Sequence, residues 1–429
     1  MSALPLTGRM RPDRTPHSLA EWRALGGYSG AERALKMTPA EVLETVAQAN
    51  LNGRGGAGFP AAAKWRFMKA PGEGPGNGPN YLIVNGDEME PGAFKDRLLL
   101  EAAPHQVIEG ALITAYATHA SEAIVLIRDE YRAAHAAILR AIAEAEDAGL
   151  LGRNILGSGF DLTVRLHPSA GRYIVGEETA LIESLEGKRA VPRKRPPFPA
   201  QSGLWGRPTT VNNVETISLV PAILEHGAQW FRALSRTEEG GTKLYGVSGR
   251  VRRPGLFEAP MGTTARELID LAGGVSGDGV LRCFQPGGGA SGFLEPDALD
   301  IPLDFRHVRE AGSMFGTGTM IVLDRTACPV GVLARHMRFY ARESCGWCTP
   351  CREGLPWASK ILDALEAGTA RREDLEILHM TAAEAGPRGR SFCDLMGGAM
   401  MPLATALARF GDLIEAHLDG GCPIRGGRA

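Results

Sequence analysis

The sequence has 429 residues, with 47 lysines and arginines against 49 aspartates and glutamates, so its formal net charge is −2. This balance gives no general electrostatic reason to bind nucleic acid or anionic lipid. No apolar run reaches the roughly 18 residues of a membrane span, and the first residues lack the apolar core of a signal peptide. We therefore expect a cytoplasmic protein of roughly two to three domains with free thiols.

A glycine-rich loop follows the first predicted helix. Residues 1–30 read as an irregular extension, and Thr38, Pro39 and Glu41 predict a capped helix that ends near Asn50. The loop, Gly53–Phe59, fits the letters of G-x-G-x-x-G, but it follows a helix, whereas a Rossmann fingerprint follows a strand. Bare N–H groups here suit a phosphate. A purely structural glycine turn is the alternative.

Three apolar segments predict strands of an α/β domain. They span residues 81–85, 123–127 and 160–166, with helices predicted over about 104–116 and 130–148. Acidic residues follow the first strand at once: Asp87, Glu88 and Glu90. The carboxyl end of a strand is where α/β sheets bind ligands, although such a run also suits a solvated loop.

Further polar clusters lie downstream. Glu177 and Glu178 begin a predicted helix, where they either complement its dipole or line a pocket. A stiff, basic and proline-rich loop spans residues 188–199, and it is either a surface arm or part of a binding site. Asn212 and Asn213 are either turn formers or hydrogen-bonding groups for a ligand.

A composition change near residues 236–241 predicts a domain boundary. The following order of strand, strand and helix, over about 242–251, 256–259 and 264–271, favours a small α+β domain of about 85 residues. From about residue 328 the apolar spacing is helical, with the last predicted helix running from Leu403 through Ile414.

The cysteines are the most specific feature of the sequence. Cys345, Cys348 and Cys351 form a C-x2-C-x2-C run, and Cys393 follows 42 residues later (393 − 351). Three close thiolates and a distant fourth suit a [4Fe–4S] cluster. Structural zinc is the main alternative, although its ligands usually come as two separated pairs. Disulfides are disfavoured by the odd count of seven cysteines. The three remaining cysteines read as isolated thiols: Cys283, Cys328 and Cys422.

Together these motifs resemble the NADH-binding flavoprotein component of respiratory complex I, the bacterial NADH:quinone oxidoreductase. The resemblance runs from about residue 17 to the end of the chain. It rests on five motifs in the family's order: Gly53–Phe59, Asn85–Gly92, Tyr173–Leu181, Val211–Thr216, and Cys345–Gly354 with Cys393.

The resemblance implies site residues for FMN, for NAD(H) and for one [4Fe–4S] cluster, and no side chain acting as acid or base. The implied FMN contacts are Gly53, Arg54, Gly55, Gly56, Lys64, Asn85, Asp87, Glu88, Tyr173, Gly176, Glu177, Asn212, Asn213 and Thr216. The implied NADH contacts are Phe59, Phe67, Glu90, Glu178, Arg195 and Phe198. The implied cluster ligands are Cys345, Cys348, Cys351 and Cys393.

It also implies a division into three domains. These are a modified Rossmann-like α/β domain for FMN and NADH over 1–238, a ubiquitin-like α+β domain of SLBB type over 239–327, and a helical [4Fe–4S] domain over 328–429. Three positions depart from the family's usual residues. Val175 replaces a common cysteine, Gly86 an alanine, and Arg195 an expected lysine, whose charge it keeps with a different donor geometry.

The implied activity is NADH dehydrogenase: hydride passes from NADH to FMN, and single electrons then pass to the cluster. The implied partners are a thioredoxin-like [2Fe–2S] subunit of type E and a large iron–sulfur subunit of type G. Together these place the chain in the cytoplasm, on the peripheral arm of a membrane-bound complex. A diaphorase subunit of a soluble NAD-linked hydrogenase or formate dehydrogenase is the nearer alternative, and a non-catalytic zinc or iron–sulfur scaffold is the other.

Overall fold

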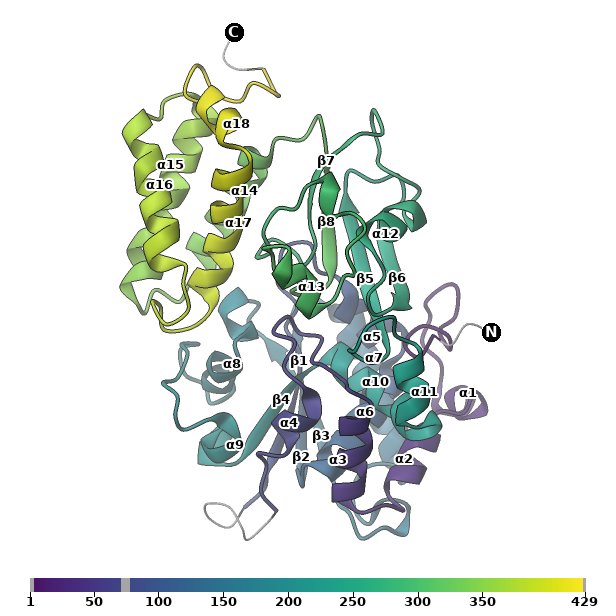
Figure 1. The fold of residues 1–429 in the computed structure, drawn as a ribbon. Helices are drawn as coiled ribbons and strands as arrows, with labels where there is room; N and C mark the ends of the chain where they lie inside the picture. Colours follow the sequence, from purple (N-terminus) through teal and green to yellow (C-terminus); the bar gives the residue numbers. More distant parts are fainter. Residues whose placement is uncertain (1–3, 71–77, 427–429) are drawn as a thin grey trace. The chain divides into compact units, whose positions relative to one another are not determined.

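The computed structural model describes residues 4–70 and 78–426 (Figure 1). The chain forms two compact units. The first comprises Met1–Met89, Phe94–Leu244 and Glu258–Gly262, and the second comprises Glu90–Ala93, Tyr245–Phe257 and Thr263–Ala429. Because the boundary falls within two strands, these units do not coincide with three consecutive domains, and the predicted domain limits stay a prediction.

The first unit contains a parallel sheet of four strands in the order β3-β2-β1-β4. Its strands are β1 (Tyr81–Gly86), β2 (Glu122–Arg128), β3 (Thr163–Ser169) and β4 (Thr209–Asn213). The predicted α/β class is therefore confirmed. The third strand begins later than its alternating pattern predicted, and it runs on through Pro168. Proline is tolerated there because β3 is an edge strand.

Helices cover both faces of this sheet. They are α5 (Lys95–Ala102), α6 (Pro104–Ala117), α7 (Arg132–Asp147), α8 (Glu178–Leu185), α9 (Pro199–Ser202), α10 (Val214–His226) and α11 (Ala228–Ala233). Successive side chains of a strand point to opposite faces, yet Leu82 and Ile83 are both fully buried. Ile83 joins a core cluster with Val175 and Leu181, whereas α6 and α10 pack on β1 as well. A sheet covered on both sides explains the continuous apolar runs of its strands.

The order in which the chain adds strands to this sheet changes direction at β1. The strands proceed from β1 to β2 and β3 on one side, and the chain then returns to place β4 on the other side. Asn85 is paired with Asn213 in this register. Such a switch point opens a crevice at the carboxyl ends of the two strands, where open α/β sheets bind ligands.

Four short helices precede the sheet: α1 (Leu19–Ala24), α2 (Ser29–Ala34), α3 (Pro39–Gln48) and α4 (Ala61–Trp65). The predicted capping box of α3 is confirmed. The Glu41 N–H donates to Thr38 Oγ1 at 3.3 Å, and the Thr38 N–H donates to Glu41 Oε2 at 2.7 Å. These bonds fix the start of the helix that leads into the glycine loop.

The second sheet has the strand order β6-β5-β8-β7. Its strands are β5 (Thr242–Gly249), β6 (Gly255–Pro260), β7 (Leu281–Gln285) and β8 (Thr319–Asp324), with helices α12 (Ala265–Leu271) and α13 (Phe305–Glu310) between them. Strand β8 is parallel to β5 and antiparallel to β7. The predicted order of two strands and a helix is confirmed by β5, β6 and α12.

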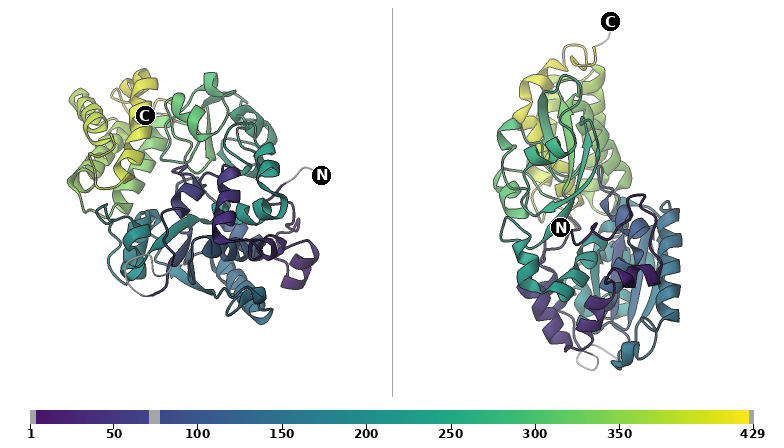
Figure 2. Two further views of the ribbon diagram at one scale, coloured as in Figure 1. Left: turned by 60° about the horizontal axis from the view of Figure 1, so that its bottom comes forward. Right: turned by 90° about the vertical axis from the view of Figure 1, so that its right-hand side faces the viewer.

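The end of the second unit is helical. Its helices are α14 (Pro329–Glu343), α15 (Leu355–Ala367), α16 (Arg372–Ala385), α17 (Leu395–Arg409) and α18 (Gly411–Ala416). Helix α16 packs against both α15 and α17, and all three run side by side (Figures 1 and 2). The prediction of one helix from Leu403 through Ile414 is wrong, because Phe410 leaves the helical conformation and separates α17 from α18.

None of the helices in the described ranges combines the length and the apolar character that a membrane span requires.

Candidate functional site

Predicted FMN residues gather at the switch point of the first sheet. Asn85 and Asp87 stand at the end of β1, and Asn212 and Asn213 stand at the end of β4. The Asn85 Nδ2 donates to the carbonyl of Gly176 at 3.3 Å, and the Asp87 N–H donates to Asn85 Oδ1 at 3.1 Å. Residues from three separate segments therefore meet where a parallel sheet binds its ligand.

The glycine loop lies against the same end of the sheet. The Gly53 N–H donates to the Phe59 carbonyl at 2.9 Å and closes the loop, while the Arg54 N–H donates to Thr216 Oγ1 at 2.8 Å. A Cβ on Gly55 would lie 3.1 Å from Asn213 Cβ, so glycine permits this close approach. Gly56 has a φ of 124°, which side chains rarely adopt. An exposed loop of small residues beside the crevice suits a phosphate-bearing ligand.

The Arg54 side chain lies beneath this loop rather than on its surface. It is fully buried, and Nη2 donates to the Gly240 carbonyl at 2.8 Å. Its charge can act on a ligand through the loop, although direct contact with FMN stays a prediction.

Lys64, Glu178 and Arg195 form a linked group of charges. Lys64 Nζ donates to Glu178 Oε2 at 2.5 Å and to the Val211 carbonyl at 2.8 Å. Arg195 Nη2 lies 3.3 Å from Glu178 Oε1. Burial acts to raise the pKa of Glu178, but Lys64 and Arg195 outweigh it and hold the pKa below its usual value. Glu178 is therefore an ionised carboxylate held between two cations.

Glu177 caps helix α8. Its Oε2 accepts the N–H groups of Thr179 and Ala180 at 2.9 Å each, and its other oxygen pairs with Arg195. Tyr173 and Gly176 belong to the short 3-10 turn Tyr173–Gly176 just before it. This turn is tied to β1 by the bond from Asn85 to Gly176, so the motif belongs to the same site.

Several large aromatic side chains of the first unit are exposed, Trp205 among them at 56%. Phe59, Phe67 and Phe198 expose 51%, 61% and 52% of their surfaces. Burying a phenylalanine against an apolar partner is favourable, so a ligand that covered these three rings would gain free energy from them. All three are the residues predicted to stack on the adenine ring of NADH.

Glu88 has a structural role that its motif did not reveal. Its Oε1 accepts the N–H groups of Lys95 at 2.9 Å and Asp96 at 3.1 Å, and Oε2 accepts that of Arg97 at 3.2 Å. It therefore caps α5. Burial, together with the nearby Asp96, raises the pKa of Glu88 to about 7.

Glu90 belongs to the second unit. Its Oε1 accepts the Ala290 N–H at 2.7 Å, and Tyr340 Oη donates to it at 3.4 Å. These bonds fix the carboxylate, and its contact with NADH stays a prediction.

Sequence reasoning missed a buried charge network beside the switch point. Lys95 Nζ lies 2.7 Å from Asp96 Oδ1, 3.0 Å from Glu215 Oε2 and 3.2 Å from Asn213 Oδ1. Lys243 Nζ lies 2.7 Å from Glu215 Oε2. Burial acts to raise the pKa of Glu215, but Lys243 and Lys95 lower it to about 2. No local pattern announces these residues, because their partners are distant in the sequence.

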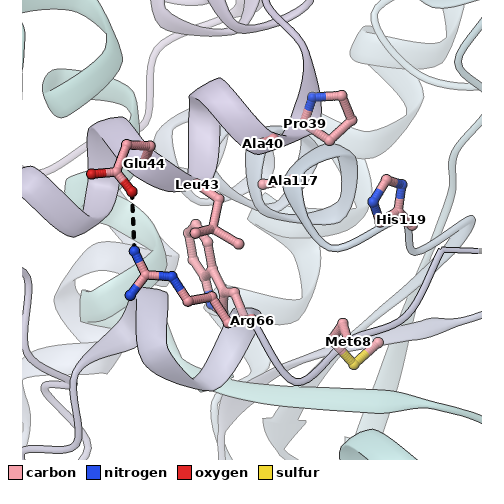
Figure 3. Close-up of a pocket in the computed structure, with 9 residues that line it drawn as sticks. Pro39, Ala40, Leu43, Glu44, Arg66, Met68, Ala117 and His119 are labelled. Atoms are coloured by element: carbon pink, nitrogen blue, oxygen red, sulfur yellow. Dashed lines mark hydrogen bonds and ion pairs between the residues drawn. The ribbon is translucent and has the colours of Figure 1, made fainter.

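A separate pocket of about 370 Å³ opens beside α3 and α4 (Figure 3). Leu43, Met68 and His119 contribute to its lining, and Glu44 Oε2 pairs with Arg66 Nη2 at 3.0 Å across it. No predicted cofactor residue is among those that line it, within the part of the chain that the structure describes.

The cysteine run joins α14 to α15. Cys345 and Cys348 lie in the connecting loop, and Cys351 lies in the π-helical turn Pro350–Gly354 that continues into α15. Gly346 has a φ of 70°, which turns the loop between the first two cysteines. The loop thus presents its thiols within one tight turn.

The structure brings the distant Cys393 to this run. Burial, followed by the neighbouring Cys348 and Cys393 thiols, raises the pKa of Cys351. The ring of Trp347 meets that of Phe392 at a centroid distance of 6.3 Å, so the two segments also touch beside the thiols. All seven cysteines are free of disulfides. Four thiols from two segments fit a [4Fe–4S] cluster, whose iron would stabilise them as thiolates.

The prediction that all three remaining cysteines stand alone is wrong. Cys328 and Cys422 lie with Glu366 and His417 in one compact cluster. These residues come from three segments that lie far apart in the sequence, so no local motif predicted that they would come together.

Three protein-family models match parts of the chain. The family model described as the Nuo51 FMN-binding domain matches residues 46–222. The NADH-ubiquinone oxidoreductase-F iron-sulfur binding region matches residues 331–417, and the SLBB domain matches residues 244–292. The predictions of FMN and of a [4Fe–4S] cluster in place of zinc are thus confirmed.

F subunits of bacterial NADH-quinone oxidoreductases are similar to this chain over most of its length. The chain is 50% identical over 416 residues to the F subunit of NADH-quinone oxidoreductase in Escherichia coli strain K12, covering 96% of this chain and 93% of that one. It is 48% identical over 399 residues to the F subunit of the same enzyme in Mycobacterium tuberculosis strain H37Rv, covering 93% and 89%.

A solved structure has the same fold. A chain of an NAD+-reducing [NiFe]-hydrogenase in the H2-reduced state matches with a TM-score of 0.81 at 36% identity, covering 95% of this chain and 68% of that one. The identity to the two F subunits is higher and extends over nearly the whole length of both partners. The chain therefore belongs to the family of NADH-quinone oxidoreductase F subunits.

Proposed function

We propose that this chain oxidises NADH with bound FMN and delivers the electrons to its [4Fe–4S] cluster, as the NADH dehydrogenase subunit of a respiratory NADH:quinone oxidoreductase. The observation that carries the proposal is the convergence at the switch point. The ends of β1 and β4, the glycine loop and the turn before α8 meet there, although they are far apart in the sequence. A chance set of glycines and carboxylates would not gather at the ligand-binding end of a parallel sheet.

FMN, when bound, accepts hydride from NADH and releases electrons one at a time. The chain's own residues supply binding and orientation. Gly55 and Gly56 offer backbone N–H groups at the crevice, while the Gly53 N–H closes the loop, and Lys64 offers a cation within the same unit. Asn85 places its amide group at the end of β1, where it can orient a planar ring by hydrogen bonds. The Asn212 amide is held within the protein, because its Oδ1 accepts from Trp65 Nε1 and its Nδ2 donates to Thr210 Oγ1, at 3.2 Å each.

NADH is held by the exposed aromatic rings and by the charged group. Phe59, Phe67 and Phe198 provide flat apolar surfaces for the adenine ring. Glu178 accepts hydrogen bonds from ribose or nicotinamide groups, and Arg195 and Lys64 balance its charge. Arginine at position 195 presents a planar fork, so it binds phosphate or carboxylate in two-point geometry, which a lysine cannot do. The family resemblance also assigns Glu90 to NADH.

The cluster ligands are Cys345, Cys348, Cys351 and Cys393. Cys351 is buried, but the other three thiols are partly exposed and lie beside the exposed rings of Trp347 and Phe392, which suits a centre that must exchange electrons with a partner protein. We propose that the partners are iron–sulfur subunits of the same assembly: a thioredoxin-like [2Fe–2S] subunit of type E and a large subunit of type G. Through them the chain sits on the peripheral arm of a membrane-bound complex, on the cytoplasmic side.

The diaphorase subunit of an NAD+-reducing hydrogenase is the second candidate. The TM-score of 0.81 to such a chain favours it, because the fold and the cofactor region are then shared. The identity of 50% to the respiratory F subunit against 36% to the hydrogenase chain favours the respiratory assignment.

The experiment is an anaerobic absorbance titration of the purified chain with NADH. We expect a visible flavin band that bleaches on addition of NADH, over a broad iron–sulfur absorbance. Cys348→Ser should lose the cluster signal in electron paramagnetic resonance but keep NADH-dependent reduction of a dye. Cys283→Ser removes a thiol of the same unit that lies outside the ligand set and should keep both properties.

Three results would overturn parts of this proposal. Iron–sulfur absorbance without flavin would return the glycine loop to a structural role. An intact cluster in the Cys348→Ser protein would remove Cys348 from the ligand set. A flavin that NADPH or another donor reduces while NADH does not would exclude NADH as the substrate.

A further inference from the structure

A second group of metal-binding side chains lies in the helical part of the second unit. It comprises Cys328, Glu366, His417 and Cys422, whose ligand atoms all lie within 4.8 Å of one another. His417 is fully buried, and Cys328 and Cys422 expose only 4% and 6% of their surfaces. Four potential ligands of three chemical types rarely meet in a buried space without a function, since each polar group loses its hydration.

The orientation of His417 suits a metal ligand. Its Nδ1 lies 2.6 Å from the Leu413 carbonyl, and because a carbonyl oxygen can only accept, Nδ1 carries the proton. In the neutral ring the lone pair is then on Nε2, and Nε2 is the atom that faces Cys328 and Glu366. Metal-bound histidines are commonly held in this way, by a hydrogen bond from the other ring nitrogen to a backbone carbonyl.

Two of the separations are close to the edges of a tetrahedral zinc site. Zinc lies about 2.3 Å from sulfur, about 2.0–2.1 Å from nitrogen and about 2.0–2.2 Å from oxygen, so tetrahedral angles place sulfur and nitrogen about 3.6 Å apart and nitrogen and oxygen about 3.3 Å apart. In the structure Cys328 Sγ lies 3.4 Å from His417 Nε2, and Glu366 Oε1 lies 3.3 Å from the same nitrogen.

The charges also balance. A zinc ion with two thiolates, one carboxylate and a neutral imidazole carries a net charge of about −1. Arg425 pairs with Glu366 Oε2 and hydrogen-bonds Cys422, so it supplies the compensating positive charge and orients two ligands. Gly331 makes room for it, because a Cβ there would lie 1.9 Å from Arg425 Nη2.

We propose that Cys328, Glu366, His417 and Cys422 bind one structural Zn²⁺ ion, separate from the [4Fe–4S] cluster. Two thiolates and an imidazole favour zinc over magnesium or calcium, which prefer oxygen ligands. Four protein ligands leave no open position for water or substrate, so the ion is structural rather than catalytic.

A metal ion at this site would link the start of α14, the end of α15 and the segment that follows α18. Cys328 is the N-cap of α14, Glu366 lies in the last turn of α15, His417 follows α18, and Cys422 belongs to the C-terminal tail. The cysteine run of the cluster connects the other ends of α14 and α15. Because α14 has 15 residues, the two centres lie at opposite ends of a helical hairpin about 22 Å long. One ion would thus hold the end of the bundle that the cluster does not reach.

The test is metal analysis of the chain purified with its cofactors and without chelators. We expect about one zinc per chain in addition to the iron of the cluster. Cys328→Ser and Cys422→Ser should each lower the zinc content by about tenfold or more while iron and flavin are retained. The matched control is Cys283→Ser. Cys283 is a buried cysteine of the same unit that belongs neither to the proposed zinc ligands nor to the [4Fe–4S] ligands, so this variant should keep its zinc.

A second measurement on the unaltered protein covers the case in which the variants fail to fold. Zinc K-edge absorption should fit two sulfur ligands at about 2.3 Å and two nitrogen or oxygen ligands at about 2.0 Å. The absence of zinc after incubation with ZnCl₂, zinc that survives both serine substitutions, or a mass 2 Da lower from a Cys328–Cys422 disulfide would each overturn the proposal.

Discussion

Glu178 is the residue of the proposed nucleotide site whose charge state is best defined. It lies between Lys64 and Arg195, and its carboxylate is ionised at neutral pH. Replacing it by glutamine removes one negative charge from a site that binds the doubly negative NADH. We expect Glu178→Gln to lower the KM for NADH by about threefold to tenfold, because a charge near a partly exposed site changes binding by roughly 1 kcal/mol. Steady-state kinetics with a dye acceptor measures this.

A suitable control is Glu44→Gln, which breaks the exposed pair with Arg66 in the same unit. Its KM should not change. The FMN content of both variants should equal that of the unaltered chain, and an unchanged KM in Glu178→Gln would remove this residue from the nucleotide site.

The buried charges around Glu215 predict unequal effects of two substitutions. Lys95, Lys243 and Arg54 all act on Glu215, and Asp96 and Glu88 act on Lys95 as well. Glu215→Gln would remove the anion that the three cations share, whereas Lys243→Met would remove a group whose pKa burial lowers to about 7 and would leave Glu215 paired with Lys95. We expect the first to cost about 3–5 kcal/mol of unfolding free energy and the second clearly less. Equilibrium unfolding in urea compares them, and equal costs would contradict the charge balance.

The same carboxylate gives a pH dependence. The folded-state pKa of Glu215 is about 2, below its ordinary value of 4.5, so its ionised form stabilises the folded chain above about pH 4.5. This contribution is lost as the pH falls toward 2. Between about pH 5 and pH 3, the unfolding free energy of the unaltered chain should therefore fall more steeply than that of Glu215→Gln. Parallel curves would show that Glu215 does not control acid stability.

At the scale of elements, helix α3 offers a direct test of a cap. Thr38→Ala removes the oxygen that accepts the Glu41 N–H, and it should destabilise the first unit by about 1 kcal/mol. Thr45→Ala changes the same residue type within the same helix, where its hydroxyl bonds only to the Glu41 carbonyl. That variant should have little effect, since alanine is a better helix former. Thermal unfolding of the two variants compares the cap with the helix interior.

Elements with local signals were predictable from sequence, and those decided by distant contacts were not. The cap of α3 and the strands β1 and β2 follow from residues adjacent in the chain. The start of β3 was misplaced, because its pairing with β2 decides which residues of an alternating run enter the sheet. The break at Phe410 likewise escaped the apolar pattern, since Leu407 and Ile414 on either side of it are both buried.

The site residues divide in the same way. The glycine loop, the cysteine run and the paired asparagines indicated the cofactor-binding regions through their residue types and spacing. The roles of Glu88 as a cap, of Arg54 beneath its loop, and of Lys95 and Lys243 in a buried network depend on partners brought together by folding. The group around His417 is the extreme case, because its ligands come from three separate segments.

At the scale of the whole molecule, the two compact units predict separable unfolding. Calorimetry should resolve two thermal transitions, one for each unit. Cys348→Ser, which removes the cluster, should lower the transition of the unit containing α14–α18 by several degrees, because a bound metal centre stabilises the fold that holds it. The other transition should stay in place as long as FMN is bound. A single transition that moves as a whole would contradict this independence.

The return of the chain from β3 to β4 has a consequence for biosynthesis. Asn85 pairs with Asn213, which follows 128 residues later (213 − 85), and Arg54 is held by the carbonyls of Gly240 and Thr242. A ribosome must therefore release more than half of the polypeptide before β4 and the glycine loop can join β1 at the proposed FMN site. Pairing over so long a loop makes assembly of this sheet slow. Until then the nascent chain exposes unpaired, apolar strands, so its demand for chaperones should be greatest before residue 244 emerges.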